Sequence, residues 1–173
     1  QLILIENDKS ADANLKFFNS DGGESGACGN GTRCVADFIS KETNNKTIIL
    51  NTFSGNLKSK ILGNNIVTTE IGIAKTDWNE IPLSEKLNTK NLNIKILDKN
   101  NKEHHGGTAV NVGNPHIIFF VNELENFDIK NIGPGIENHN FFPEKCNVTI
   151  AQVIDKDLIR VKVWERGAGL TKA

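Results

Sequence analysis

The sequence predicts an α/β (α+β) fold built from two similar halves, and each half consists mostly of β-strands. Three observations support this expectation. Short apolar or alternating runs, which are typical of strands, follow one another along most of the chain. One helical pattern begins straight after a Gly-rich bend that ends at Cys28. The order of strand, strand and Gly-rich bend found near the start returns 146 residues later, at the end of the sequence.

The first half contains a run of expected strands around a single helix. We expect strands at 2–5, 15–18, 47–51, 56–62 and 66–73. The last two would form a hairpin, because Gly63-Asn64-Asn65 has the composition of a tight turn. A helix is expected from about residue 29 to residue 41, with an apolar stripe of Cys34, Val35, Phe38 and Ile39 facing the core.

A polar stretch at 75–90, which contains Pro82, separates the halves, so we predict domains of 1–76 and 77–173. In the second half we expect strands at 94–97, 108–112, 117–121, 147–153 and 158–164. Residues 98–107 read as a polar loop that leaves His104 and His105 at the surface. A short helix is expected within 124–136, stopped by Gly133-Pro134-Gly135.

The internal repeat becomes visible when the sequence is shifted by 146 residues. Residues 15–18 then fall on 161–164, Gly23 falls on Gly169, and Ser25 falls on Thr171. If both halves share one order of elements, the residue after Ala173 would be the counterpart of Cys28, and it is not part of this chain.

The composition of the chain argues against several classes of protein. The formal net charge is -1, from 20 basic and 21 acidic residues, which argues against nucleic acid or a membrane surface as partner. No apolar stretch approaches the length of a membrane span, and no signal peptide is visible at the start. Three irregularly spaced cysteines do not form a disulfide framework, so we expect a cytoplasmic protein. Residue 1 is Gln, so the chain does not begin at a start codon.

Cys28 is the candidate reactive residue. It stands where the Gly-rich bend ends and the helical pattern begins, so its sulfur would lie at a helix N-terminus, where backbone N–H groups and the helix dipole favour a thiolate. Gly29 and Gly31 would let the backbone approach a small anionic ligand. Cys34 and Cys146 are interpreted as packing residues.

Three stretches together resemble one known family: residues 18–22 with 28–34 (Cys-Gly-Asn-Gly-Thr-Arg-Cys), Gly113-Asn114-Pro115-His116, and residues 165–169. They resemble the diaminopimelate epimerases, which are cofactor-independent amino-acid racemases. The resemblance implies two pseudo-symmetric halves, each a curved, mostly antiparallel sheet wrapped around a central helix, with both halves incomplete in this chain. It also implies interconversion of LL- and meso-diaminopimelate for lysine and peptidoglycan synthesis, by two cysteines and without pyridoxal phosphate, metal or nucleotide.

The same resemblance assigns roles to individual residues. Cys28 matches the first catalytic cysteine, and His116 and Glu165 match groups that tune the proton state of the two cysteines. Arg166 would pair with the distal carboxylate of diaminopimelate, to which its planar fork is suited. The positions that match substrate-contacting residues are Gln1, Asn19, Gly29, Asn30, Asn114, Asn147, Glu165 and Arg166. Full-length members of the family are expected to be homodimers.

The chain also departs from the family pattern. The first strand of the family, which carries a substrate-binding asparagine, is absent, as is the second catalytic cysteine with its helix. We therefore expect an internal piece of an epimerase that is inactive by itself. Two alternatives remain: a related racemase or isomerase acting on another amino acid, such as proline, or a non-catalytic module that keeps one ligand-binding half-site. Asn30 and Arg166 argue against proline, which lacks the distal groups that they would serve.

Overall fold

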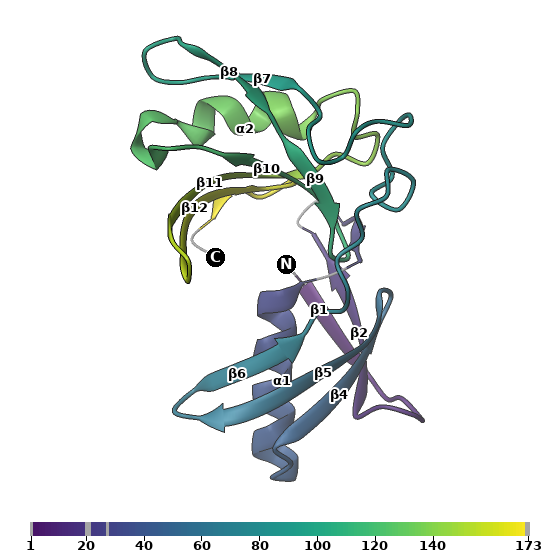
Figure 1. Cartoon of the computed structure of the whole chain (residues 1–173). Helices are drawn as coiled ribbons and strands as arrows, with labels where there is room; N and C mark the ends of the chain where they lie inside the picture. Colours follow the sequence, from purple (N-terminus) through teal and green to yellow (C-terminus); the bar gives the residue numbers. More distant parts are fainter. Residues whose placement is uncertain (1, 20–21, 27, 172–173) are drawn as a thin grey trace. The chain divides into compact units, whose positions relative to one another are not determined.

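The computed structural model describes residues 2–19, 22–26 and 28–171 of the chain. The chain divides into two compact units, residues 1–73 (unit 1) and 74–173 (unit 2), and each unit has its own hydrophobic core. Both units combine a β-sheet with helix, so the predicted α/β fold is confirmed (Figure 1). None of the described helices is long and apolar enough to cross a membrane.

Unit 1 is built on a six-stranded sheet. The strands are β1 (Leu2–Glu6), β2 (Ala13–Phe18), β4 (Thr47–Thr52), β5 (Gly55–Gly63) and β6 (Ile66–Glu70), hydrogen-bonded in that order, with β3 (Glu24–Ser25) paired to β2. Only β2 and β4 run parallel among these described pairs. The predicted β5–β6 hairpin is confirmed, and Asn64 and Asn65 turn the chain with φ angles of 51° and 59°.

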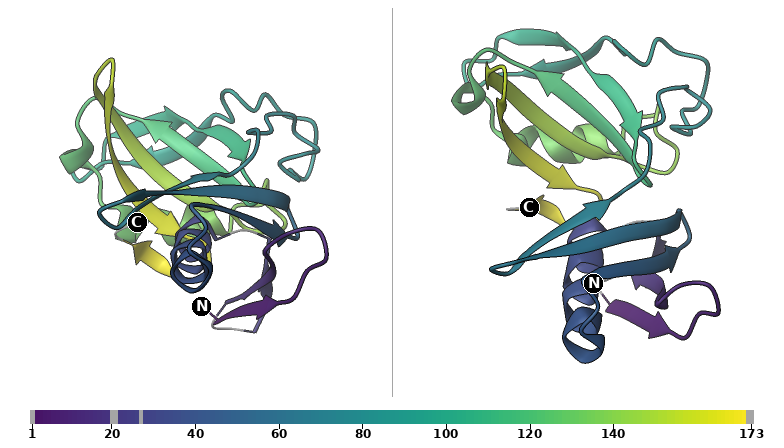
Figure 2. Two further views of the ribbon diagram at one scale, coloured as in Figure 1. Left: turned by 90° about the horizontal axis from the view of Figure 1, so that it is seen from below. Right: turned by 60° about the horizontal axis from the view of Figure 1, so that its bottom comes forward.

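The helix α1 (Gly29–Thr43) lies along one face of the unit 1 sheet (Figures 1 and 2). Its buried face is formed by Gly31, Thr32, Val35, Ala36, Ile39 and Ser40. The predicted apolar stripe is therefore correct for Val35 and Ile39 and wrong for Cys34 and Phe38, both of which are exposed. The strands cover the side of the helix that carries the small residues Gly31, Thr32 and Ala36, and the sheet can approach the helix axis closely only there.

Unit 2 is built on a five-stranded sheet, a two-stranded hairpin and two helical segments. The sheet consists of β9 (Thr108–Asn111), β10 (Pro115–Phe120), β11 (Asn147–Asp155), β12 (Leu158–Glu165) and β13 (Gly169–Thr171), in that spatial order. Only β10 and β11 run parallel among the described pairs of this sheet. The hairpin is formed by β7 (Ile94–Leu97) and β8 (Glu103–Gly106), and the helical segments are η1 (Leu124–Asn126) and α2 (Ile129–Glu137). The helix α2 lies between the hairpin and one face of the sheet (Figure 1), and side chains from all three form one core.

Two predictions for unit 2 are wrong. The expected polar loop at 98–107 contains β8, in which His104 and His105 pair with Ile96 and Lys95. The expected helix does not stop at Gly133-Pro134-Gly135, because α2 continues to Glu137. Gly133 is tolerated in the helix because the indole of Trp164 occupies the space of its missing side chain: a Cβ built there would lie 2.5 Å from Trp164 Cγ.

This contact makes Gly133→Ala a sharp test of the packing in unit 2. The added methyl group would force Trp164 or α2 to move, and we expect a loss of about 1–3 kcal/mol in the free energy of unfolding, measured by urea denaturation. Gly135→Ala is the matched control, because no atom lies within 4 Å of its built Cβ and alanine is the better helix former. A Gly133→Ala protein as stable as Gly135→Ala would contradict this packing.

The predicted internal repeat is confirmed by the strand registers. In unit 1 the paired positions are 2 with 18, 5 with 15, and 17 with 25. In unit 2 they are 148 with 164, 151 with 161, and 163 with 171, so each pair returns after a shift of 146 residues. The elements β1, β2 and β3 therefore correspond to β11, β12 and β13, and the repeat is structural rather than a chance similarity of sequence.

The repeat also reveals a difference between the two sheets. In unit 1, the side chains of Ala13, Leu15 and Phe17 are only 1–3% exposed, because α1 covers them. Their counterparts in unit 2 are Ile159, Val161 and Val163, and the first two are 54% and 48% exposed. No described element of unit 2 covers this face, since α2 and η1 pack on the opposite one.

Candidate active site

Cys28 is the N-cap residue of α1, so its predicted position at a helix N-terminus is confirmed. Its backbone is extended, with φ -147° and ψ 90°, and its Sγ accepts a hydrogen bond from the Gly31 N–H at 3.3 Å. Its carbonyl oxygen accepts from both the backbone N–H and the hydroxyl of Thr32, each at 2.9 Å. These bonds hold the sulfur over the first turn, where the N–H groups of the helix point out of its end.

Gly31 explains why the first turn of α1 can lie so close to the sheet. A Cβ built at Gly31 would come within 2.6 Å of Ile3 Cδ1, 3.1 Å of Cys28 Sγ and 3.4 Å of Phe17 Cε1. A side chain at this position would therefore push the N-terminus of the helix, and the thiol with it, away from β1 and β2. Cys28 is half-buried and packs against the core of unit 1.

Three other predicted residues lie in the same part of unit 1. Gly29 and Asn30 are the first two residues of α1, directly after Cys28. The exposed Asn30 side chain accepts a hydrogen bond from Arg33. Asn19 follows β2 and closes a tight bend: its N–H donates to the Gly23 carbonyl at 2.9 Å, and its carbonyl accepts from Gly22 at 3.0 Å. Gln1 lies outside the described residues.

In unit 2 the structure brings four of the predicted residues into one hydrogen-bonded group. The His116 Nε2 atom lies 2.9 Å from Asn114 Oδ1 and 3.1 Å from Asn147 Nδ2. The Asn147 Oδ1 atom accepts from the backbone N–H of Arg166 at 2.7 Å, which directs its amide nitrogen toward the imidazole. His116 and Asn147 are register partners on the parallel strands β10 and β11, so the sheet itself sets their side chains next to each other.

The environment of His116 favours an uncharged ring. Burial and the positive charge of Arg166 lower the pKa of His116 from 6.5 to about 4. The imidazole is therefore neutral at physiological pH, and its tautomer decides the role of Nε2: a protonated Nε2 donates to Asn114 Oδ1, and an unprotonated Nε2 accepts from Asn147 Nδ2. A neutral imidazole in such a site can take part in proton transfer without first losing a proton.

The lowered pKa of His116 makes the stability of the folded chain depend on pH. Between pH 6.5 and 4 the unfolded chain binds a proton at His116 that the folded chain does not, so stability falls as the pH drops through this range, by about 3 kcal/mol in total. We expect Arg166→Gln to raise the pKa of His116, since it removes the nearby positive charge. Arg160→Gln, an exposed change on the preceding strand β12, should leave it unchanged. An NMR titration of the His116 ring measures both, and equal midpoints in the two variants would contradict the role of Arg166.

Glu165 and Arg166 form the turn between β12 and β13. The Glu165 Oε1 atom accepts from the Thr171 hydroxyl at 3.1 Å, and the Ala168 N–H donates to the Glu165 carbonyl at 3.1 Å. The Arg166 guanidinium donates from Nη1 to the Glu144 carbonyl at 2.6 Å. Both side chains are half-buried, so each retains exposed surface from which it could meet a ligand.

Sequence reasoning missed one buried acidic residue that touches this turn, Glu137 at the end of α2. Its carboxylate accepts from the Trp164 indole N–H at 2.7 Å and from the Gly167 N–H at 3.1 Å. Nothing in the sequence indicated this, because a glutamate at the end of a helix usually lies in solvent. Cys146 is fully buried, as predicted for a packing residue, and burial together with the charge of Glu137 raises the pKa of its thiol to about 12.

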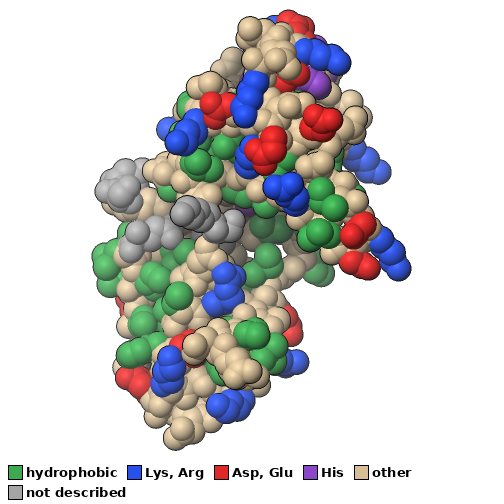
Figure 3. Space-filling view, turned by 90° about the vertical axis from the view of Figure 1, so that its left-hand side faces the viewer, with side chains coloured by type: hydrophobic (Ala, Val, Ile, Leu, Met, Phe, Trp, Pro, Cys, Tyr) green, Lys and Arg blue, Asp and Glu red, His purple; other side chains and the backbone are tan. Residues whose placement is uncertain are grey.

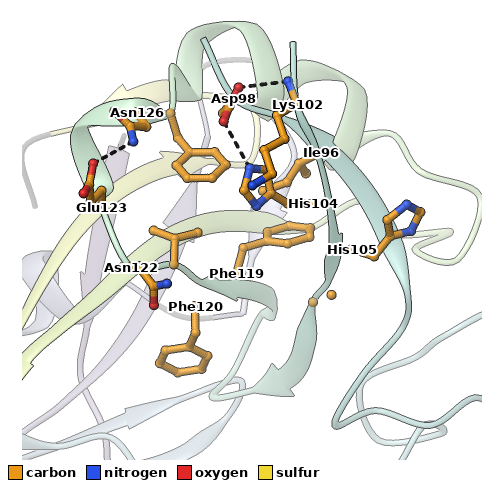
Figure 4. Close-up of a pocket in the computed structure, with 14 residues that line it drawn as sticks. Ile96, Asp98, Lys102, His104, His105, Phe119, Phe120, Asn122, Glu123 and Asn126 are labelled. Atoms are coloured by element: carbon orange, nitrogen blue, oxygen red, sulfur yellow. Dashed lines mark hydrogen bonds and ion pairs between the residues drawn. The ribbon is translucent and has the colours of Figure 1, made fainter. Parts of the chain in front are cut away.

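The structure also contains a pocket that none of the predicted site residues lines. It has a volume of about 410 Å³ and lies between β8 and the end of β10 in unit 2 (Figure 4). His104, predicted to be a surface residue, lines it: its Nε2 lies 3.2 Å from Asp98 Oδ2, and its ring packs edge-on against Phe127. Across the described ranges, no group of three or more His, Cys, Asp or Glu side chains is arranged to hold a metal ion.

Comparison with known proteins gives a consistent result. The family model described as diaminopimelate epimerase matches residues 1–76 and 108–173, which is more than half of the chain. Diaminopimelate epimerase of Pelagibacter ubique (strain HTCC1062) is 69% identical over all 173 residues, which make up 63% of that protein. That of Acidiphilium cryptum (strain JF-5) is 42% identical and is covered to 61%. The chain thus spans less than two thirds of these relatives.

Solved structures support the fold. A hydroxyproline epimerase from Agrobacterium vitis, with bound trans-4-hydroxy-L-proline, matches with a TM-score of 0.56 at 15% identity, covering 98% of this chain and 53% of that one. A PhzF-family phenazine biosynthesis protein from Bacillus anthracis matches with the same TM-score at 13% identity, covering 98% of this chain and 60% of that one. At such low identity these matches establish a shared fold.

Proposed function

The chain belongs to the diaminopimelate epimerase family, and from this premise we propose that it supplies one of the two acid–base groups of a cofactor-independent diaminopimelate epimerase. The family is one of isomerases. The observation that carries the proposal is the position of Cys28, whose sulfur caps α1 beside the Gly29 and Asn30 amides. We further propose that the complete protein acts in the cytoplasm, in lysine and peptidoglycan precursor synthesis, as a homodimer.

The proposed reaction inverts one α-carbon of diaminopimelate. The Cys28 thiolate takes the α-proton from one face of the substrate, and the C–H electron pair moves toward the α-carboxylate. The developing charge needs hydrogen-bond donors, which the Gly29 and Asn30 N–H groups at the start of α1 can provide. A second acid then delivers a proton to the opposite face, so the substrate leaves with inverted configuration and the enzyme with its two proton positions exchanged.

The hydrogen-bonded residues of unit 2 are proposed to bind the substrate and to act on the second acid–base group. Arg166 is proposed to pair with the distal carboxylate, and Asn114 and Asn147 to contact the polar groups of the substrate, as Asn19 and Gln1 would in the first half. His116 and Glu165 are proposed to tune the proton state of the cysteines. The neutral state of His116 supports this role, because a neutral ring can both accept and return a proton.

The structural repeat supports a second acid–base group of the same kind. The bend and helix that follow β3 in unit 1 carry Cys28, and β13 is the counterpart of β3. We propose that the segment that follows β13 in the complete protein contributes the second cysteine, on a helix that covers the open face of the unit 2 sheet. The relatives are long enough to contain such a segment, because this chain makes up about 63% of the first of them.

The experiment uses this chain extended at both ends with the flanking residues of its Pelagibacter ubique relative, which we call the extended chain. We expect it to interconvert LL- and meso-diaminopimelate, as followed by chiral chromatography. Proline and trans-4-hydroxyproline are the comparison substrates, since they lack the distal groups that Arg166 would bind. Inversion of either at a rate equal to that of diaminopimelate would favour a related racemase, and inversion of none of the three would favour a non-catalytic module.

A further inference from the structure

The turn at residues 165–168, between β12 and β13, is held by hydrogen bonds to side chains of α2 and β11. Two successive backbone N–H groups in the turn are bound by side chains from elsewhere in unit 2. Arg166 N–H donates to Asn147 Oδ1 at 2.7 Å, and Gly167 N–H donates to Glu137 Oε1 at 3.1 Å. Both acceptors are buried, with exposed fractions of 4% for Asn147 and 7% for Glu137.

We propose that Glu137 is a positioning residue, which fixes the turn that carries Glu165 and Arg166 and thereby sets how the site receives its substrate. This inference rests on the proposed function of the turn. Glu137 reaches the turn from the last residue of α2 and binds two donors with its two oxygens, Gly167 N–H and the Trp164 indole N–H.

The chemistry of the carboxylate explains why this position uses glutamate. A buried carboxylate is costly unless its oxygens are hydrogen-bonded, and here each oxygen has one donor. A glutamine would offer one oxygen and an NH₂ group, so it could accept from Trp164 or from Gly167 but not from both. The second donor would then face the NH₂ group and be left without an acceptor.

Trp164 and Gly133 complete the arrangement. The indole lies directly against Gly133 of α2, one turn before Glu137 along the same helix, and this contact brings its Nε1 within 2.7 Å of the carboxylate. Trp164 also directly precedes Glu165 in the chain. The end of α2 thus holds the turn on both sides of the two proposed functional residues, at Trp164 before them and at Gly167 after them.

The test compares Glu137→Gln with Glu125→Gln in the extended chain. Glu125 is the matched control, because it is an exposed glutamate of unit 2 that pairs with Lys162 and Arg160 and does not touch the turn. We expect Glu137→Gln to lower kcat/KM for diaminopimelate about tenfold, mainly through a higher KM, because Arg166 lies next to the released Gly167 amide. Trp164→Phe, which keeps the bond to Gly167, should shift KM in the same direction by less, and it carries the test if Glu137→Gln does not fold.

A second readout separates this proposal from the proposed function. Hydrogen exchange at the Gly167 and Arg166 amides, followed by NMR, should be faster in Glu137→Gln than in Glu125→Gln, whether or not the extended chain is active. Unchanged exchange of these amides in Glu137→Gln would overturn the proposal. Faster exchange with an unchanged KM would also overturn it, because Glu137 would then have a purely structural role. An extended chain that is inactive before any substitution would instead contradict the proposed function, and amide exchange alone would then decide whether Glu137 holds the turn.

Discussion

Replacing Cys28 by alanine in the extended chain is expected to lower the rate of diaminopimelate epimerisation by about 10³-fold or more. The substitution removes the group proposed to carry the proton on one face of the substrate and leaves the backbone of α1 in place. Neither of the other cysteines can replace it. Cys34 is exposed beside the buried face of α1, and Cys146 is fully buried with a thiol pKa of about 12. The rate is measured from the appearance of the opposite isomer by chiral chromatography.

Cys34→Ala is the matched control for this experiment, because it removes a thiol from the same helix without touching the N-cap. We expect it to keep the rate of the unmodified extended chain. A Cys28→Ala protein that retained a rate within about tenfold of Cys34→Ala would exclude Cys28 as the proton carrier.

The second large effect concerns the 173-residue chain on its own, which we expect to self-associate. The uncovered face of the unit 2 sheet carries apolar side chains in register on three neighbouring strands. The most exposed of them are Phe120 at 61%, Val153 at 58%, Ile159 at 54% and Val161 at 48%. On the face of the molecule that Figure 3 draws, hydrophobic side chains are exposed among charged ones. A contiguous apolar surface of this kind favours association in water.

Sedimentation velocity over a range of concentrations measures this association. The double substitution Ile159→Lys with Val161→Lys, on the open face, should weaken it by about tenfold or more. Leu158→Lys is the matched control: Leu158 is 51% exposed on the same strand, but its place in the alternation puts it on the other face. A monodisperse monomer with a sharp cooperative thermal transition would contradict the prediction.

The sequence predicted well those features that depend on short-range signals. The Gly-rich bend followed by a helical pattern placed Cys28 at the N-terminus of α1, because glycines and a change of period mark such a boundary without any tertiary information. The shift of 146 residues predicted the repeat of two strands and a bend, and the strand registers confirm it pair by pair.

Other features depend on which surfaces meet, and the sequence does not contain that information locally. The apolar residues of α1 form a wide stripe, and the sequence pattern alone does not show which side of this stripe the sheet packs against. The sheet covers the side with Gly31 and Ala36, so Cys34 and Phe38 remain exposed. In the same way, α2 passes through Gly133 and Pro134 because Trp164, 31 residues later in the chain, packs on the glycine.

The candidate site also contains both kinds of feature, residues with a signal in the sequence and residues whose role depends on tertiary contacts. The family resemblance pointed to His116, Asn147 and Arg166, and the structure joins them by hydrogen bonds across β10, β11 and the turn after β12. Glu137 could not be found in this way, because its role follows from a helix end that reaches the turn only in the folded unit. Long-range contacts of buried polar groups are thus the part of the candidate site that sequence reasoning misses.

The most direct test of the central claim, that this chain supplies one of two acid–base groups, is the assay of diaminopimelate in heavy water with chiral analysis of the product. We expect the extended chain to give the inverted isomer with one deuterium at the α-carbon, because the incoming proton comes from a thiol that exchanges with solvent. The 173-residue chain alone should give no inverted isomer above background. Robust inversion by the 173-residue chain alone would contradict the two-cysteine account, and it would require another acid among its own residues, with His116 the first to be replaced.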